Sequence, residues 1–297
     1  MDSLKSLNGI FPPIPTPFEN DAVAYHHLAA NVQKWNTTGL SGYVVFGSNG
    51  EYPYLSLEEK LNVIETVRQA ANSDMPVIAG SGCESTRETI QLTNQCAKAG
   101  AQAALVVTPH YYGGKMTDEA LFHHYNRVAD EATIPIILYN VTKFTHINLA
   151  PKLAAELSEH ENIIGIKDSS GNISQLGQYL NLVLPSFSVL VGTAGALKGA
   201  LDLGCEGGIL ALANIAPKIC VDIYKLVLEG DHEAAVNLQL RMIPVNNAVT
   251  SDYGVAGLKK ALDLLGYFGG IPRSPLLPLA ETASEKIKEI LQQSQLL

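Results

Sequence analysis

The sequence has few charged residues and no long apolar run. Charged residues make up 16% of the 297 residues and hydrophobic residues 46%, which is enough apolar material for a large buried core and excludes a disordered chain. No apolar run approaches the length of about 20 residues that a membrane-spanning helix requires. We therefore expect a folded protein without a membrane partner.

Basic residues are also scarce. The formal net charge is −9, so the chain lacks the excess of lysine and arginine that neutralises phosphates over a broad surface. Nucleic acid is therefore excluded as an expected partner. A small anionic substrate is not excluded, because a few aimed dipoles or local positive groups suffice to bind one.

Cysteine is rare, and its pattern carries no site. Cys83, Cys96, Cys205 and Cys220 form no CxxC pair and no short metal-binding spacing, which predicts free thiols in a reducing compartment. The first residues show neither a signal-peptide pattern nor an arginine-rich transit pattern. The expected location is the cytoplasm, or the mitochondrion if a transit segment has been trimmed.

Motifs for metal binding and for other common chemistries are missing as well. His26–His27 and His123–His124 are adjacent pairs in helical patterns, so we expect the two rings of each pair to diverge. Since there is no HxxxH motif either, the sequence predicts no metal site and no cofactor. The GxSxG elbow of serine hydrolases and the GxxxxGK[ST] phosphate loop are also absent.

What the sequence does contain is a series of short apolar runs that alternate with amphipathic segments. Each run is almost continuously apolar, as is typical of a parallel strand buried on both faces. The runs cover residues 9–14, 42–47, 76–82, 103–109, 135–140, 163–168, 188–193 and 207–212. Helices are predicted between them, one over 57–71 with Ser56 and Glu59 in a capping box and one over 86–99 that ends at Gly100.

Eight such runs predict an α/β protein with a (β/α)8 TIM barrel. A doubly wound sheet is the alternative, but its GxGxxG fingerprint after the first strand is missing. We assign residues 1–230 to the barrel. Residues 231–297 hold three more helical patterns and form a C-terminal helical extension of the same domain. In such barrels the chemistry takes place at the carboxyl ends of the strands.

Two reactive side chains stand near the ends of neighbouring runs. Lys167 follows an apolar stretch, and an amine among apolar neighbours sheds its proton more readily and attacks a carbonyl. The resulting imine stabilises a carbanion, which carbon–carbon cleavage requires. The alternative is a structural lysine that reaches solvent or pairs with Asp168. Tyr139 is a candidate proton relay, or else a core tyrosine.

Two loops follow other predicted strands. The turn Gly47-Ser48-Asn49-Gly50-Glu51 offers backbone and side-chain donors that suit a carboxylate, and a purely structural turn is the alternative. The paired aromatics Tyr111 and Tyr112 precede two glycines in a loop. Exposed aromatics in such a loop predict either a substrate lid or a subunit contact.

Together these segments resemble the dihydrodipicolinate synthase / N-acetylneuraminate lyase superfamily of pyruvate-handling Schiff-base enzymes, over nearly the whole chain. The matching pieces, in order, are Thr16-Pro17-Phe18, the 47–51 turn, Ala79-Gly80-Ser81-Gly82, Val107-Thr108-Pro109, Tyr139-Asn140-Val141 and Gly165-Ile166-Lys167-Asp168. The resemblance implies a carbon–carbon lyase, usually a homotetramer built as a dimer of dimers.

The resemblance also implies a role for each residue. Lys167 would form the imine with pyruvate or another 2-oxo acid, and Tyr139 would shuttle protons. Tyr111 of a neighbouring subunit would complete the catalytic set through Ser48. The expected substrate-binding residues are Gly47, Ser48, Asn49, Ser169, Gly192 and Leu210.

Within the superfamily, the stretches 79–86, 211–214 and 257–260 look most like the 4-hydroxy-2-oxoglutarate aldolases of animal mitochondria. This predicts cleavage of 4-hydroxy-2-oxoglutarate to pyruvate and glyoxylate. Cleavage of a 2-keto-3-deoxy sugar acid and the dihydrodipicolinate synthase reaction are the alternatives. A keto-acid sensor without activity is a further one, which the presence of both the lysine and the tyrosine disfavours.

The segment after the shuttle tyrosine departs from the superfamily pattern. Thr142 replaces the usual proline, and His146 replaces the usual glycine. Phe144 stands where the synthases carry an arginine that grips the carboxylate of the second substrate, a contact that an apolar ring cannot make. Lys143 or His146 is left as the alternative cation. The lysine-feedback pocket of the synthases is also unmatched.

Overall fold

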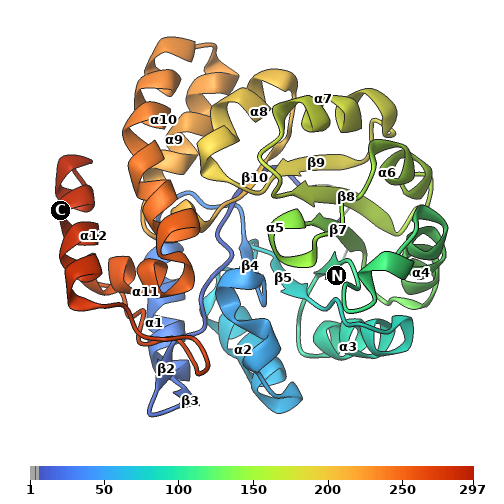
Figure 1. Ribbon diagram of the computed structural model, residues 1–297, viewed down its shortest axis with the longest axis horizontal. Helices are drawn as coiled ribbons and strands as arrows, with labels where there is room; N and C mark the ends of the chain where they lie inside the picture. Colours follow the sequence, from blue (N-terminus) through green and yellow to red (C-terminus); the bar gives the residue numbers. More distant parts are fainter. Residues whose placement is uncertain (1–3, 5–6) are drawn as a thin grey trace.

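The computed structural model describes residue 4 and residues 7–297. Eight parallel strands form one sheet in the order β1-β10-β9-β8-β7-β6-β5-β4 (Figure 1). They are β1 (Gly9–Phe11), β4 (Tyr43–Val45), β5 (Val77–Gly80), β6 (Ala103–Val107), β7 (Ile136–Asn140), β8 (Ile163–Asp168), β9 (Ser188–Val191) and β10 (Gly207–Ile209). Every residue of these strands is buried, and each strand lies within one of the eight predicted runs.

The sheet closes between β1 and β4 through a short contact. Pro13 and Val44 form an isolated parallel bridge, in which the Ile14 N–H donates to the Val44 carbonyl at 2.9 Å and the Val44 N–H donates to the Pro12 carbonyl at 3.0 Å. Because Pro12 and Pro13 have no N–H to donate, the closing ladder stays short. The predicted (β/α)8 TIM barrel is confirmed.

Alternate residues of each strand fill the inside of the barrel. Phe11, Val44, Leu105, Ile137 and Ile209 belong to this inner cluster. The residues between them along the strands pack outward against the helices, as the alternation of side chains in a strand requires.

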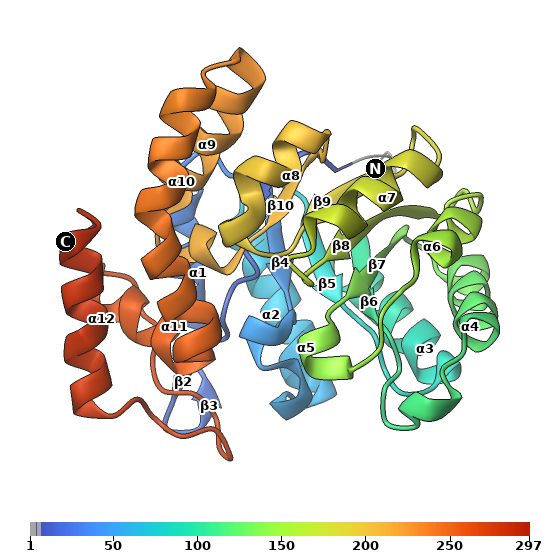
Figure 2. The ribbon, with the colours of Figure 1, turned by 45° about the horizontal axis from the view of Figure 1, so that its top comes forward.

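Helices surround the barrel (Figures 1 and 2). They are α1 (Tyr25–Trp35), α2 (Leu57–Ala70), α3 (Thr86–Lys98), α4 (Asp118–Glu131), α5 (Thr142–Thr145), α6 (Pro151–Leu157), α7 (Ile173–Leu182), α8 (Leu197–Leu203) and α9 (Pro217–Glu229). The predicted capping box of α2 is present, since the Glu59 N–H donates to Ser56 Oγ at 3.1 Å and the Ser56 N–H donates to the Glu59 carboxylate at 2.9 Å. Gly100 follows α3 with a φ of 113°, which confirms the predicted stop.

Three more helices follow the barrel, namely α10 (His232–Asn247), α11 (Gly254–Leu264) and α12 (Glu281–Gln293). A π-helical segment, Ala248–Asp252, joins α10 to α11. The helical content agrees with the sequence analysis, whereas the boundary at residue 231 stays a prediction. A short hairpin before α1, formed by β2 (Phe18–Glu19) and β3 (Ala22–Val23), was not predicted from the sequence.

Among residues 4 and 7–297, no helix is both long enough and apolar enough to cross a bilayer.

Candidate active site

Lys167 lies one residue before the end of β8, and it is 3% exposed. Its Nζ atom lies 4.2 Å from the centroid of the Tyr139 ring. In the described part of the chain, no carboxylate lies within ion-pair distance of this amine. The alternative of a lysine that reaches solvent is therefore wrong.

A β-bulge adjusts the register of the strand that carries Lys167. The pairing of β7 with β8 shifts by one residue between Ile136 and Ile137, which leaves Ile164 as an extra residue in β8. Beyond the shift, Tyr139 is the register partner of Lys167, so the two side chains lie on the same, inner face of the sheet.

Asp168, the neighbour of Lys167, is engaged elsewhere. Its carboxylate accepts hydrogen bonds from Asn140 Nδ2 at 2.8 Å, from the Ser170 N–H at 3.1 Å and from Ser170 Oγ at 2.6 Å. Consecutive residues of a strand point to opposite faces, so Asp168 faces away from the amine. The alternative of a Lys167–Asp168 ion pair is wrong, and the three hydrogen bonds hold the strand end in place.

The turn after β4 lies against the tyrosine. Ser48 Oγ is 3.3 Å from Tyr139 Oη. Thr16 Oγ1 donates to the Gly50 carbonyl at 2.8 Å, and Glu51 closes the turn in the left-handed region with a φ of 54°. These contacts fix the turn relative to the fifth barrel strand, β7.

Glu51 also anchors the turn to the C-terminal part of the chain. One carboxylate oxygen lies 2.5 Å from Lys259 Nζ, and the two side chains are 1% and 0% exposed. The other oxygen accepts from the Arg273 N–H at 2.8 Å, and Lys259 Nζ donates to the Ile271 carbonyl at 3.0 Å. Burial lowers the pKa of Lys259, while Glu51 acts in the opposite direction. This ion pair was not predicted from the sequence.

A cavity of about 250 Å³, called the inner cavity below, opens at these strand ends. Its lining consists of Pro13, Ser48, Asn49, Tyr139, Val141, Lys143, Phe144, Lys167, Ser169, Ser170, Gly192, Thr193, Ala211, Thr250 and Ser251. The lining contains two lysines and no acidic residue, so it is locally positive although the chain has a net charge of −9. Such surroundings favour a small carboxylic acid.

A larger cavity of about 520 Å³, the outer cavity, adjoins the inner one and shares several of its lining residues. Tyr52, Tyr54, Leu276 and Leu277 contribute to its own lining. Burial raises the pKa of Tyr52 to about 12, so its hydroxyl stays protonated at neutral pH. The outer cavity offers room for a second molecule next to the inner cavity.

The structure brings most of the predicted site residues together. Ser48, Asn49, Ser169 and Gly192 line the inner cavity with Lys167 and Tyr139. Gly47 and Leu210 do not line it. Leu210 is fully buried and its N–H donates to the Phe11 carbonyl, while the next residue, Ala211, reaches the cavity instead.

Tyr111 lies outside both cavities and is 78% exposed. Its N–H and that of His110 donate to one oxygen of Glu84, at 2.8 and 2.9 Å, which holds the loop in place. Tyr111 therefore does not reach Ser48 within its own chain. Its predicted role in the site of a neighbouring subunit stays a prediction.

The residues after Tyr139 that depart from the superfamily pattern lie in different places. Lys143 and Phe144 line both cavities, and Lys143 Nζ donates to the Thr250 carbonyl at 3.2 Å. His146 lines neither cavity. Its φ of 57° is left-handed, the conformation that the glycine usual at this position adopts without strain. Of the two alternative cations, only Lys143 is in position.

Part of the lining of the inner cavity was not predicted from the sequence. Thr250 and Ser251 line the inner cavity from the π-helical segment. The spacing of apolar residues does not predict a π-helix, although this conformation is frequent at functional sites. Pro13, Ser170, Thr193 and Ala211 were missed too. These four residues lie just beyond strand ends, and that position is the signal by which the sequence would have revealed them.

One expectation about metal ligands is wrong. The rings of His26 and His27 do not diverge, since their centroids are 3.9 Å apart with a tilt of 39°. Together with Glu19 they form the one group of at least three close potential ligands found among residues 4 and 7–297. None of the three lines either cavity, so the group takes no part in the site around Lys167.

Known proteins resemble the chain over almost its full length. The 4-hydroxy-tetrahydrodipicolinate synthase of Archaeoglobus fulgidus is 39% identical over 292 residues, which covers 98% of this chain and 99% of the relative. A chloride-inhibited dihydrodipicolinate synthase from Acinetobacter baumannii, solved in complex with pyruvate, is 32% identical with a TM-score of 0.93, covering 98% and 100% of the two chains. A monomeric dihydrodipicolinate synthase variant is 29% identical with a TM-score of 0.93, covering 98% and 97%.

The barrel and its relatives define the class of the protein, which is a carbon–carbon lyase of the aldolase type. The model of the dihydrodipicolinate synthetase family matches residues 6–294, and the chain belongs to this family. The resemblance to the superfamily is thereby confirmed. The closer likeness to 4-hydroxy-2-oxoglutarate aldolases is not confirmed, because relatives such as the Archaeoglobus fulgidus protein are named as synthases. These relatives favour the dihydrodipicolinate synthase reaction, which the sequence offered as an alternative.

Proposed function

We propose that the protein activates pyruvate as an imine on Lys167. The amine attacks C2 of pyruvate, the C2 oxygen leaves as water, and loss of a methyl proton gives an enamine carbon that attacks an aldehyde. Hydrolysis then releases the product and the free amine. The reverse sequence cleaves a carbon–carbon bond. The observation that carries this proposal is the buried amine, 4.2 Å from the Tyr139 ring centroid, in a cavity lined without acidic residues.

Each neighbour of the amine has a proposed task. Tyr139 passes protons to and from the reacting carbons, and Ser48, 3.3 Å away, orients its hydroxyl. Ser48 and Asn49 hold the carboxylate of pyruvate, with Ser169 and Gly192 on the remaining wall. No metal or cofactor takes part in this sequence of steps.

The first candidate for the full reaction is synthesis of 4-hydroxy-tetrahydrodipicolinate, as the names of the relatives support. That product is a seven-carbon dicarboxylic acid with one ring nitrogen. Removing the three carbons of pyruvate leaves a four-carbon amino-acid aldehyde, aspartate 4-semialdehyde. Its carboxylate would be held by Lys143, the second lysine of the inner cavity.

The second candidate is cleavage of 4-hydroxy-2-oxoglutarate to pyruvate and glyoxylate, with the 2-keto-3-deoxy sugar acids as longer analogues. The observation that favours it is the lining itself, which has Phe144 and no arginine in either cavity. A lysine makes a single point contact where an arginine grips a carboxylate with two parallel hydrogen bonds. Binding of glyoxylate, a two-carbon acid, depends less on this contact.

Borohydride reduction in the presence of pyruvate tests the shared step. A pyruvate-derived mass is expected on Lys167, and it should be lost in Lys167→Ala and retained in Lys152→Ala, which removes an exposed lysine of α6. Trapping that persists in Lys167→Ala would refute the proposal. A protein that only binds keto acids would show affinity without trapping.

Parallel assays separate the candidate reactions. Pyruvate consumption with aspartate 4-semialdehyde is compared with pyruvate release from 4-hydroxy-2-oxoglutarate and from 2-keto-3-deoxygluconate. The substrate with the highest kcat/KM identifies the reaction. Lys143→Met should lower kcat/KM for a partner with a carboxylate and leave pyruvate trapping intact.

We also propose a homotetramer, built from dimers in which Tyr111 reaches the site of the neighbouring chain. The exposure of Tyr111 and Tyr112, 78% and 71%, supports an interface at this loop. Light scattering after size exclusion should give four times the chain mass of 31.8 kDa, and a single-chain mass would refute the assembly. The relatives named above include an archaeal and a bacterial protein, which supports a cytoplasmic location and offers nothing for a mitochondrial one.

A further inference from the structure

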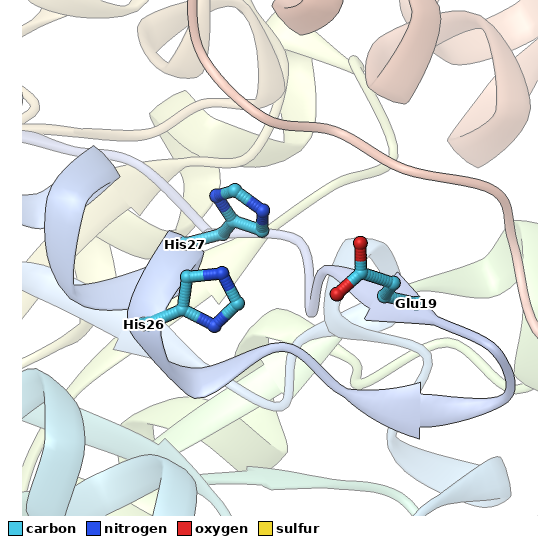
Figure 3. A group of neighbouring side chains, drawn as sticks. All are labelled: Glu19, His26 and His27. Atoms are coloured by element: carbon cyan, nitrogen blue, oxygen red, sulfur yellow. The ribbon is translucent and has the colours of Figure 1, made fainter.

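Three side chains that bind metals in proteins meet at the start of α1, outside both cavities. Glu19 comes from β2, and His26 and His27 are the second and third residues of α1. One ligand atom from each residue lies within 4.8 Å of the other two. Figure 3 shows the Glu19 carboxylate on the hairpin strand facing the two imidazole rings.

The ring of His27 is held in a defined orientation. It stacks on Phe268, with ring centroids 3.7 Å apart and an angle of 6° between the planes. The backbone of Phe268 forms two hydrogen bonds with the side chain of Asn31 in α1. Asn31 Nδ2 donates to the Phe268 carbonyl at 2.8 Å, and the Phe268 N–H donates to Asn31 Oδ1 at 3.0 Å. The helix therefore fixes both the histidine and the aromatic ring behind it.

The strand that carries Glu19 is fixed as well. Glu19 pairs with Ala22 across a two-residue turn in which Asn20 and Asp21 both have positive φ angles, 51° and 64°, as a tight hairpin turn requires. Arg273 Nε donates to the Asp21 carboxylate at 3.2 Å and ties the turn to the C-terminal segment. The carboxylate and the imidazoles thus start from backbones that are already in place.

We propose that Glu19, His26 and His27 form a binding site for a divalent transition metal, with Zn²⁺ as the best match. Two imidazoles and one carboxylate are a usual three-ligand set for zinc, with water as the fourth ligand. Mg²⁺ and Ca²⁺ prefer oxygen ligands and bind imidazole poorly. Tetrahedral bonds of about 2.0–2.1 Å place ligand atoms about 3.3 Å apart. Glu19 and His26 are exposed, so rotation of their side chains closes the remaining gap.

The bound metal would join the hairpin to α1. Because this cluster lies outside both cavities, the metal has no part in the chemistry at Lys167. Its expected effect is on stability, since a ligand that binds only the folded state raises the unfolding temperature.

The test uses protein without an affinity tag, stripped with EDTA and desalted, and titrated with ZnCl₂ in a calorimeter. One Zn²⁺ per chain is expected at this site. Glu19→Gln and His26→Ala should each weaken the affinity by at least about tenfold, the scale on which even outer-shell changes act. His123→Ala removes an exposed histidine of α4 and should bind as the unaltered protein does.

Thermal unfolding with and without ZnCl₂ gives a second readout. Zinc should raise the Tm of the unaltered protein and of His123→Ala, and should raise the Tm of Glu19→Gln by less. Pairs such as His160–Asp130 remain in every variant, so the difference between variants reports this cluster alone. Equal zinc affinity in the unaltered protein, Glu19→Gln and His26→Ala would overturn the proposal, as would no binding at all.

Discussion

The ion pair between Glu51 and Lys259 offers a sharp test of how the site is held. Lys259→Met keeps most of the side-chain volume and removes the ammonium group. It leaves the Glu51 carboxylate buried with the Arg273 N–H as its remaining donor, and it leaves the Ile271 carbonyl without the Lys259 hydrogen bond. An uncompensated buried charge is one of the few single changes that destabilise a protein strongly.

The magnitude follows from the burial of both partners, which are 1% and 0% exposed. Removal of one member of a buried pair costs about 3–5 kcal/mol. At about 2–4 °C per kcal/mol for a large domain, the Tm should fall by about 6–20 °C. Because Glu51 closes the turn that carries Ser48 and Asn49, the KM for pyruvate should rise as well.

Thermal unfolding of a small set of variants measures this effect. Lys286→Met is the matched control, since its partner Glu289 is an exposed helix neighbour and the pair contributes less than about 1 kcal/mol. The double variant Glu51→Gln/Lys259→Met removes both charges and should recover more than half of the lost Tm. If Lys259→Met unfolds within about 2–3 °C of the control, or if the double variant is no more stable than Lys259→Met, the buried ion pair does not hold the site in this way.

Three further predictions concern the site and the acid stability of the barrel. Tyr139→Phe should lower kcat by about 100-fold or more, the contribution of one proton-transfer group, and steady-state rates that match the unaltered enzyme would remove Tyr139 from the mechanism. Gly192→Ala should lower kcat/KM by up to about 100-fold, because a Cβ at Gly192 would overlap Ser169 Oγ. If that overlap is the cause, the double variant Gly192→Ala/Ser169→Ala should recover part of the lost kcat/KM. Burial lowers the pKa of His124 from 6.5 to about 4. Between these two pH values the unfolded chain binds a proton that the folded chain does not bind, so the free energy of unfolding falls as the pH falls, by about 3 kcal/mol in total. The Tm of His124→Phe should therefore depend less on pH over this window than that of the control His123→Phe, and parallel profiles would show that His124 is not the titrating group.

The strands and their chemistry were accessible from the sequence because both depend on local patterns. A strand buried on both faces must be continuously apolar, and a reactive lysine at its end stands out against that background. The capping box of Ser56 and Glu59 is equally local, since its hydrogen bonds join residues three apart. Lys167, Tyr139 and Ser48 were therefore placed correctly at one end of the barrel.

The remaining features depend on contacts between distant segments. Nothing around Lys259 indicates that its partner lies more than 200 residues earlier in the chain. The stacking of His27 on Phe268 likewise joins the two ends of the sequence, and it orients a ring that helical geometry alone predicts to point elsewhere. Thr250 and Ser251 reach the cavity through a π-helical segment, which tertiary packing selects over the ordinary helix.

The bulge at Ile164 gives β8 one residue more than a regular ladder needs. Deletion of this single residue would leave Ile163 opposite Ile136 and Gly165 opposite Ile137 as consecutive pairs, so the ladder would become regular. Lys167 would still lie opposite Tyr139, with its amine on the inner face of the sheet. A relative with a one-residue gap at this point of β8 therefore keeps the geometry of the site, and such a gap in an alignment is no evidence that the chemistry has been lost.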